Sequence, residues 1–176
     1  MSDPTRLSRP LVVVMGVAGS GKTTVGQALA ERLGVEYADA DDFHSPASVA
    51  KMASGQPLDD DDRAPWLVAI GQWLAEHDDR GAVVGCSALR RRYRDVLRAA
   101  APRLEVLHLA GDPAVVTQRV AERPGHFMPA SLVTSQLETL EPLEPDEAGN
   151  AFDLTAPVDD IVADFTAILD RTGDRT

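Results

Sequence analysis

The feature that most constrains this chain is the segment Gly16–Thr23, which directly follows the apolar run Leu11–Met15. It reads GVAGSGKT and fits the pattern G-x-x-x-x-G-K-[ST], a loop that cradles phosphate groups between a buried strand and a helix. Glycines let the backbone turn its N–H groups toward phosphate oxygens, and the helix that follows adds its positive dipole end. The segment therefore predicts a strand–loop–helix unit that binds a nucleoside triphosphate.

Side chains in this loop suit the phosphates and their metal ion. Lys22 can reach the β- and γ-phosphates of ATP, and the Thr23 hydroxyl can complete the coordination of Mg²⁺. A glycine-rich turn that matches by chance is disfavoured by the strand and helix around it. We expect the ATP site to include Gly16, Val17, Ala18, Gly19, Ser20, Gly21, Lys22, Thr23 and Thr24.

The rest of the chain alternates short apolar runs with segments of helical period, which predicts a parallel sheet with crossover helices. The expected strands are 11–15, 35–38, 82–86, 104–110 and 151–155. The expected helices are 22–33, 46–54, one opened by Asp62 and Pro65, 89–101, 113–122, 130–140 and 158–171, with an exposed loop over 141–149. Residues 1–176 should thus form one α/β domain, a three-layer sandwich around a five-stranded parallel sheet.

Composition excludes several classes of partner. The chain has 176 residues, enough for one domain with a sizeable core, and its net charge of −11 argues against a nucleic-acid partner. No apolar run approaches the ~18 residues of a membrane-spanning helix, and residues 1–10 form a polar extension without the apolar core of a signal peptide. The single cysteine, Cys86, excludes an internal disulfide, so we expect a cytoplasmic protein with no membrane partner.

Two aspartates follow the second expected strand, at the edge of the sheet where open α/β folds bind ligands. Asp39 and Asp41 are two residues apart, so an extended segment points both carboxylates to one side. We expect Asp39 to hold Mg²⁺ through water and Asp41 to accept the proton of an attacking hydroxyl. The alternative, that these residues only form turns and caps, stays open for Asp39, and Asp42 is interpreted as structural.

A pair of arginines ends the helix expected over 113–122. Arg119 and Arg123 are spaced i, i+4, so they project from one face, and the segment PGHF that follows supplies little packing material. This combination predicts a mobile lid over about 123–140 that brings arginines, Arg123 above all, to the transferred phosphoryl group. The alternative is a helix end whose cations complement the helix dipole.

An acidic run at 59–62 precedes Arg63. Four adjacent acids repel one another, so they either stay solvated or meet cations, and they can hold Arg63 so that it presents its fork to a substrate carboxylate. An acidic N-cap accounts for Asp62 but not for the arginine beside it. Five arginines crowd the segment after the third expected strand, and they either bind a small anion or lie on a solvated helix face. They are Arg90, Arg91, Arg92, Arg94 and Arg98.

Histidine and cysteine give weaker signals. His44 and His126 are candidates for polar contacts to a substrate, although a lone histidine is more often only satisfied within the fold. Cys86 follows an apolar strand and is interpreted as a buried small residue, not a nucleophile. No Cys/His spacing indicates a zinc site.

Together these features resemble the gluconokinases, a family of phosphate-loop kinases related to shikimate and adenylate kinases. The resemblance covers nearly the whole chain from residue 11 to about 170, and its most restrictive blocks are KMASGQPL at 51–58 and DDDR at 60–63. It is carried by the segments 16–24, 39–44, 51–58, 60–63, 65–67, 86–89, 93–95, 125–127, 135–136 and 139–141.

The resemblance implies phosphorylation of D-gluconate at its terminal hydroxyl by ATP and Mg²⁺, on a phosphate-loop kinase fold with a mobile lid, commonly as a homodimer. It also implies that Lys22 and Thr23 handle phosphate and metal, and that Asp41 faces the acceptor hydroxyl. The residues that it places at the sugar acid or the lid are Asp41, His44, Lys51, Arg63, Ser87, Arg90, His126 and Arg123.

Two positions depart from the family's usual pattern. Arg90 stands where lysine is more frequent, which changes reach and fork geometry, so either Arg63 or Arg90 can bind the substrate carboxylate. Ala40 stands where glycine is usual, which predicts that no positive φ is needed there.

Two other functions stay open at this point. One is a kinase of the same fold that acts on a different small acid or on a nucleotide. The other is an ATP-binding sensor without turnover, which is disfavoured because Lys22, Thr23, Asp41 and Arg123 are all present.

Overall fold

The five strands form one all-parallel sheet in the order β2-β3-β1-β4-β5, as expected. The computed structural model describes residues 9–123 and 130–173. The strands are β1 (Leu11–Met15), β2 (Glu36–Asp39), β3 (Ala82–Gly85), β4 (Glu105–Ala110) and β5 (Gly149–Asp153). Because β1 and β3 lie in the middle of the sheet, the segments that follow them lie between those that follow β2 and β4.

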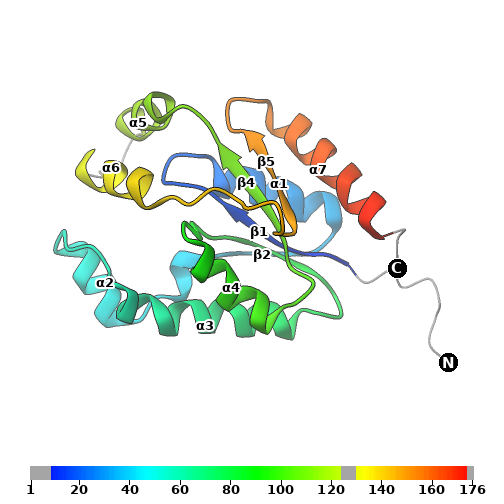
Figure 1. Cartoon of the computed structure of the whole chain (residues 1–176), viewed down its shortest axis with the longest axis horizontal. Coiled ribbons are helices and arrows are strands. Elements are labelled where there is room, and N and C mark those ends of the chain that lie inside the picture. The colour runs from blue at the N-terminus through cyan, green and yellow to red at the C-terminus, as the bar shows by residue number, and fades with distance from the viewer. Residues whose placement is uncertain (1–8, 124–129, 174–176) are drawn as a thin grey trace.

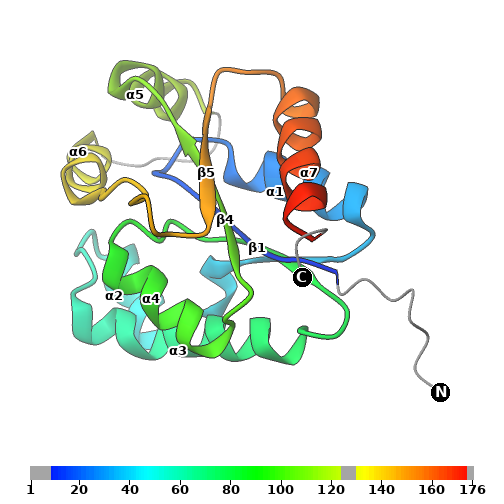
Figure 2. The same ribbon diagram turned by 45° about the vertical axis from the view of Figure 1, so that its right-hand side comes forward.

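Helices cover both faces of the sheet (Figures 1 and 2). Helices α3 and α4 pack on one face, while α1 and α7 pack on the other, and α5 and α6 lie together toward one end. The helices are α1 (Lys22–Leu33), the 3₁₀ turn η1 (Ala40–Phe43), α2 (Pro46–Ala53), α3 (Asp60–Glu76), α4 (Arg91–Ala100), α5 (Pro113–Glu122), α6 (Ala130–Thr139) and α7 (Val158–Gly173). The arrangement is the three-layer sandwich that the alternating pattern predicts.

The position of β1 inside the sheet explains why its sequence is a continuous apolar run and not an alternating one. All five of its residues are fully buried. Val13 and Met15 face the α3/α4 layer, whereas Val12 and Val14 face the layer of α1 and α7. A strand covered on both faces needs an apolar side chain at every position.

Helix α3 starts two residues earlier than expected, and β5 occupies 149–153 instead of 151–155. The Asp59 carboxylate accepts a hydrogen bond from the Asp62 amide at 2.8 Å, and the Asp62 carboxylate accepts one from the Asp59 amide at 3.0 Å. This reciprocal cap places the N-terminus of α3 inside the acidic run, and Pro65 lies within the helix. The four aspartates are therefore the start of a helix.

The loop before β5 was expected to be exposed, and its centre is not. The Glu147 side chain is fully buried between two arginines of α4, Arg94 and Arg98. Burial alone would raise the pKa of Glu147, but hydrogen bonds from Arg94, the Glu144 amide and Arg98 more than offset it and lower the pKa to about 2. The acidic loop is thus fastened to α4 by a buried ion pair.

Replacing Glu147 by glutamine is expected to lower the free energy of unfolding at pH 7 by roughly 3 kcal/mol, because it leaves buried arginine charge unpaired. A carboxyl with a lowered pKa stabilises the fold above its ordinary pKa of 4.5, and this contribution is lost as the pH falls toward 2. Urea denaturation at several pH values should show this slope in the wild type and lose it in Glu147→Gln. The control is Glu144→Gln, which removes an exposed partner of Arg91 in the same loop; equal losses in both variants would contradict the prediction.

The buried face of helix α4 is not purely apolar. Val96 is 37% exposed, whereas Arg94 is fully buried. In the part of the chain that the structure describes, no helix has the length and hydropathy needed to cross a membrane.

Candidate active site

Three segments meet at the carboxyl edge of the sheet. They are the phosphate loop after β1, the turn 86–90 after β3 and the segment 39–44 after β2. Since β3 lies between β2 and β1, the turn 86–90 is flanked by the other two segments. The rule that ligands bind outside the carboxyl ends of parallel strands therefore selects this edge.

The phosphate loop has the backbone that its glycines predict. Gly19 and Gly21 have φ of 79° and 97°, in the left-handed region that glycine adopts without strain. A Cβ on Gly19 would lie 2.6 Å from the Val120 side chain, so α5 packs directly on the loop. Gly21 is the N-cap of α1, and the loop therefore leads its amides to a helix N-terminus, where an anion is stabilised.

Lys22 lies folded back over this loop. Its Nζ donates to the carbonyl oxygens of Gly16 at 2.9 Å and Val17 at 3.0 Å. Burial lowers the pKa of Lys22, while the nearby Asp41 and Asp39 carboxylates oppose that shift. The ammonium group is thus held beside the loop and within the electrostatic influence of both aspartates.

Cys86 directly follows the neighbouring strand β3 and is buried, as expected from its apolar surroundings. Burial raises the pKa of its thiol to about 12. A thiol that is buried and this weakly acidic agrees with the interpretation of Cys86 as a buried small residue.

The segment after β2 is held by a short network. The Asp39 carboxylate accepts a hydrogen bond from the Asp41 amide at 2.9 Å, which caps the turn η1. The Trp66 indole of α3 donates to the Ala40 carbonyl at 2.7 Å. Ala40 lies in η1 without a positive φ, which agrees with the prediction that glycine is not needed there.

Asp41 is open to a substrate, since its side chain is 86% exposed. Desolvation by the surrounding protein raises the pKa of Asp41, and the negative charge of Asp39 raises it further. Because the carboxylate is exposed, water screens both effects. His44 stacks on Trp66 with ring centroids 4.5 Å apart, and its Nε2 lies 3.9 Å from Asp41 Oδ1. Burial lowers the pKa of His44, so the ring is neutral at neutral pH and faces the aspartate as a dipole.

Arg63 is held by an acid of its own helix, as the acidic run before it predicts. Its Nη1 lies 3.6 Å from Asp60 Oδ1 and donates to the Tyr93 hydroxyl at 3.3 Å. Its guanidinium also lies over the Tyr93 ring, 5.6 Å from the centroid.

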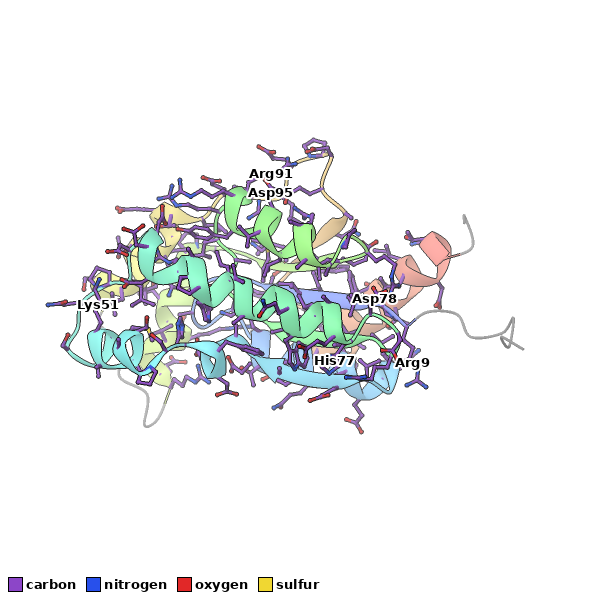
Figure 3. The ribbon with its side chains drawn as sticks, turned by 90° about the horizontal axis from the view of Figure 1, so that it is seen from below. Arg9, Lys51, His77, Asp78, Arg91 and Asp95 are labelled. Carbon is purple, nitrogen blue, oxygen red and sulfur yellow. The ribbon has the colours of Figure 1, made fainter. Side chains whose placement is uncertain are left out.

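Lys51 is held by the same acidic run. Its Nζ donates to Asp62 Oδ2 at 2.6 Å and lies 3.6 Å from Asp59 Oδ2. Figure 3 shows Lys51 at one end of the α3 face, with His77 at the other end. In this structure Lys51 clamps α2 to the start of α3, and the sequence pattern did not indicate that contact.

The arginine group after β3 is mostly occupied within the fold. Arg91 pairs with Asp146 at 2.7 Å and with Glu144, Arg92 pairs with Asp60, and Arg94 and Arg98 share Glu147. Arg91 and Asp95 lie side by side on α4 (Figure 3). Within residues 9–123 and 130–173, Arg90 makes no direct ion pair with a carboxylate, although its charge helps to lower the pKa of Asp60, and its Nε is buried without a hydrogen bond. Arg90 in the turn is therefore the member available to an anion, with Ser87 half-buried beside it.

Two arginines lie at the C-terminal end of α5, the helix that packs on the phosphate loop. Arg119 donates from Nη2 to the Leu154 carbonyl at 3.1 Å, which ties α5 to the loop after β5. Arg123 is exposed at the end of α5, and its charge is close enough to contribute to lowering the pKa of Lys22. Residues 124–129, with His126, lie outside the described residues, so the lid expected over 123–140 is seen only as the end of α5 and helix α6.

Helix α6 contributes a residue to which the sequence reasoning gave no role. Gln136 Oε1 accepts a hydrogen bond from the Ala18 amide at 2.7 Å. Ala18 belongs to the phosphate loop, so helix α6, in the segment expected to form a lid, contacts an amide of the kind that binds phosphate oxygens. The two residues are far apart in the sequence, and only the fold brings them together.

A hollow of about 520 Å³ lies at the carboxyl ends of β4 and β5. It adjoins the loop that Arg119 holds through Leu154. Its lining consists of Ala110, Gly111, Asp112, Val115, Ala151, Phe152, Asp153 and Thr155. The sequence did not indicate these residues, because the hollow is formed where two loops meet.

The donors near the phosphate loop fit a magnesium ion that keeps most of its water. Within the described part of the chain, no three His, Cys, Asp or Glu side chains form a group that could hold a metal by themselves. Thr23 and Thr24 are exposed at the start of α1, and Asp39 lies near enough to influence Lys22. Mg²⁺ bound to nucleotide phosphates needs only one or two such protein oxygens.

Sequence comparison decides the family. The chain is 50% identical over 138 residues to the gluconokinase of Gluconobacter oxydans (strain 621H), a match that covers 77% of this chain and 78% of that protein. The chain belongs to the gluconokinase family. It is also 36% identical over 164 residues to the thermoresistant gluconokinase of Escherichia coli (strain K12), with 92% of this chain and 94% of that protein covered. The prediction that the chain is a kinase is confirmed.

Structural comparison agrees with this membership of the gluconokinase family. A gluconokinase from Sinorhizobium meliloti 1021 superposes with a TM-score of 0.86 at 46% identity, and the match covers 94% of each chain. The shikimate kinase family model matches residues 18–144. Shikimate kinase from Aquifex aeolicus vf5, at 14% identity and a TM-score of 0.60, covers 94% of this chain and 99% of that one and shows the shared fold.

Proposed function

We propose that this kinase transfers the γ-phosphoryl group of ATP to the terminal hydroxyl of D-gluconate, giving 6-phospho-D-gluconate and ADP. The observation that supports D-gluconate as the substrate is the 50% identity to the Gluconobacter oxydans gluconokinase. The geometry supports the reaction, because an exposed carboxylate, Asp41, lies close enough to Lys22 of the phosphate loop to influence its pKa.

The donor half binds ATP through the loop 16–23. Its amides and the N-terminus of α1 receive the phosphates, and Lys22 moves from the Gly16 and Val17 carbonyls onto phosphate oxygens. Thr23 directly, and Asp39 through water, would hold Mg²⁺, which when bound neutralises phosphate charge. The nucleoside end of ATP extends past Arg119 toward the hollow at β4 and β5.

In the acceptor half, Asp41 acts as the base. Its carboxylate takes the proton from the terminal hydroxyl while that oxygen bonds to the γ-phosphorus and the bond to the ADP oxygen breaks. His44, neutral and stacked on Trp66, helps to orient Asp41 and the sugar acid. Arg63, Arg90 and Ser87 surround the carboxylate end, and Arg90 is the better candidate for it because Asp60 and Tyr93 already engage Arg63. Lys51 and His126 complete the proposed substrate set.

The lid closes the site in this proposal. Arg123 comes to the transferred phosphoryl group, where a guanidinium stabilises charge that develops on the equatorial oxygens. Arg119 supports the nucleotide from the same helix face. Closure also excludes water, which would otherwise hydrolyse ATP.

Assays of ADP release with one acceptor at a time test the function. We expect turnover with D-gluconate that exceeds the rate with shikimate, AMP or no acceptor by at least about 100-fold, because correct acceptor contacts lower the barrier only when all are made. Turnover only with shikimate or AMP would contradict the gluconate assignment. ATP binding without turnover on any acceptor would instead support a sensor.

We further propose that the protein works in the cytoplasm as a homodimer. The buried free thiol of Cys86 suits a reducing compartment, and the dimer is what the family resemblance implies. Sedimentation equilibrium should give twice the 18.8 kDa chain mass, and a monomer at micromolar concentration would contradict the dimer.

A further inference from the structure

Arg94 of α4 is a buried residue that the proposed chemistry does not use. Its side chain is fully buried, although arginine is rarely buried without a partner. A guanidinium has five N–H donors in a fixed plane, and here each has an acceptor. Its Nε donates to Glu147 Oε1 at 2.7 Å and one Nη2 hydrogen to Oε2 at 2.9 Å, so the pair is bidentate.

The other three donors go to backbone carbonyls. Nη1 donates to the Ala88 carbonyl at 3.0 Å and to the Glu141 carbonyl at 3.1 Å, and Nη2 also donates to the Pro142 carbonyl at 3.3 Å. Arg94 therefore joins the turn after β3 to the chain that leaves α6. Figures 1 and 2 show this chain running past α4 before it enters β5.

The turn that Arg94 holds is strained. Ala88 has φ of 43° and is the one residue other than glycine with a positive φ among residues 9–123 and 130–173. An L-residue in the left-handed region costs about 1 kcal/mol or more, so this conformation persists only when its surroundings hold it. The hydrogen bond from Arg94 to the Ala88 carbonyl is one such restraint.

A second set of bonds fixes the turn from the same side. The Glu141 amide donates to the Leu89 carbonyl at 2.6 Å, and the Glu141 carboxylate accepts from the Arg91 amide at 2.9 Å. The latter bond satisfies an amide at the start of α4, where the helix has no side-chain N-cap of its own. The turn is therefore held by the segment after α6.

We propose that Arg94 is a positioning residue for the acceptor, which holds the turn 86–90 so that Ser87 and Arg90 face the substrate carboxylate. This inference rests on the proposed function. Arg94 itself is fully buried and touches no substrate, so it acts through the Ala88 carbonyl. Because the planar fork serves five acceptors at once, a lysine at this position keeps the charge but cannot make the same set of bonds.

The test compares Arg94→Lys with Arg98→Lys by steady-state kinetics at a temperature where both proteins are folded. Arg98 contacts Glu147 at 2.7 Å, as Arg94 does, but it donates no hydrogen bond to a carbonyl of the turn 86–90. We expect Arg94→Lys to raise the KM for D-gluconate at least about tenfold, a loss typical of misplaced polar contacts, with the KM for ATP changed less than about twofold. Arg98→Lys should change both values less than about twofold.

The remaining outcomes distinguish a positioning role of Arg94 from loss of folding and from a wrong proposed function. An unchanged KM for gluconate in Arg94→Lys, or equal increases in both variants, would overturn the inference. If Arg94→Lys does not fold, the same substitution is made together with Ala88→Gly, because glycine adopts the positive φ of residue 88 without strain. Relative to Ala88→Gly alone, a higher KM for gluconate supports the inference and an unchanged KM overturns it. A wild-type enzyme that does not phosphorylate gluconate would contradict the proposed function instead, before any variant is compared.

Discussion

Replacing Lys22 by alanine is expected to reduce kcat with ATP and D-gluconate by about a thousandfold or more. A preorganised donor to developing phosphate charge contributes about 10²–10³ in rate, and Lys22 also carries a full positive charge. Its Nζ rests 2.9 and 3.0 Å from the Gly16 and Val17 carbonyls, so it is already beside the loop before the nucleotide binds. The KM for ATP should rise as well, because the lysine contacts the nucleotide before and during transfer.

Steady-state rates and ATP titrations of Lys22→Ala measure this effect. The matched control is Arg32→Ala, which removes an exposed cation at the opposite end of the same helix and should leave both quantities within about twofold. Thermal denaturation of both variants distinguishes a chemical loss from unfolding. A near-normal rate in folded Lys22→Ala would remove this lysine from the phosphate site.

Local patterns predicted the sheet and the backbone of the phosphate loop well, because each is specified over a few consecutive residues. The run LVVVM needs burial on both faces, and the loop GVAGSGKT needs glycines at particular turns, so both are readable without knowledge of the fold. Element ends were less predictable. Asp59 and Asp62 cap each other, and four adjacent acids do not reveal which of them begins the helix.

The acceptor side depends on contacts that sequence spacing does not show. Arg94 looked like one arginine of a basic helix, and Glu147 like one acid of an exposed loop, yet they form a buried pair across more than 50 residues. The contact of Gln136 with Ala18 is also long-range. The positive φ of Ala88 was unexpected because glycine usually occupies such positions, and only the surrounding hydrogen bonds make it tolerable. Long-range partners decide these roles, and a single sequence does not reveal them.

Replacing Asp41 by asparagine is expected to lower kcat by about 10²–10⁴, the usual contribution of a general base, while the Kd for ATP changes less than about twofold. The side chain is 86% exposed and bonds to no group of the phosphate loop, so its loss should not disturb the nucleotide. Asparagine keeps the shape but cannot take the hydroxyl proton. Stopped-time assays of product and separate ATP titrations give the two quantities.

The pH profile adds an independent readout for Asp41. A base must be ionised, so kcat of the wild type should rise with pH through the pKa of Asp41, which desolvation and Asp39 raise above its ordinary value of 3.8. Asp41→Asn should lose this limb, whereas Asp42→Asn, which removes the neighbouring exposed carboxylate, should keep both the limb and most of the rate. Equal losses of kcat and ATP affinity in Asp41→Asn would place the carboxylate in nucleotide binding. Equal effects of the two substitutions would show that the acidity of the turn, and not the position of Asp41, supports transfer.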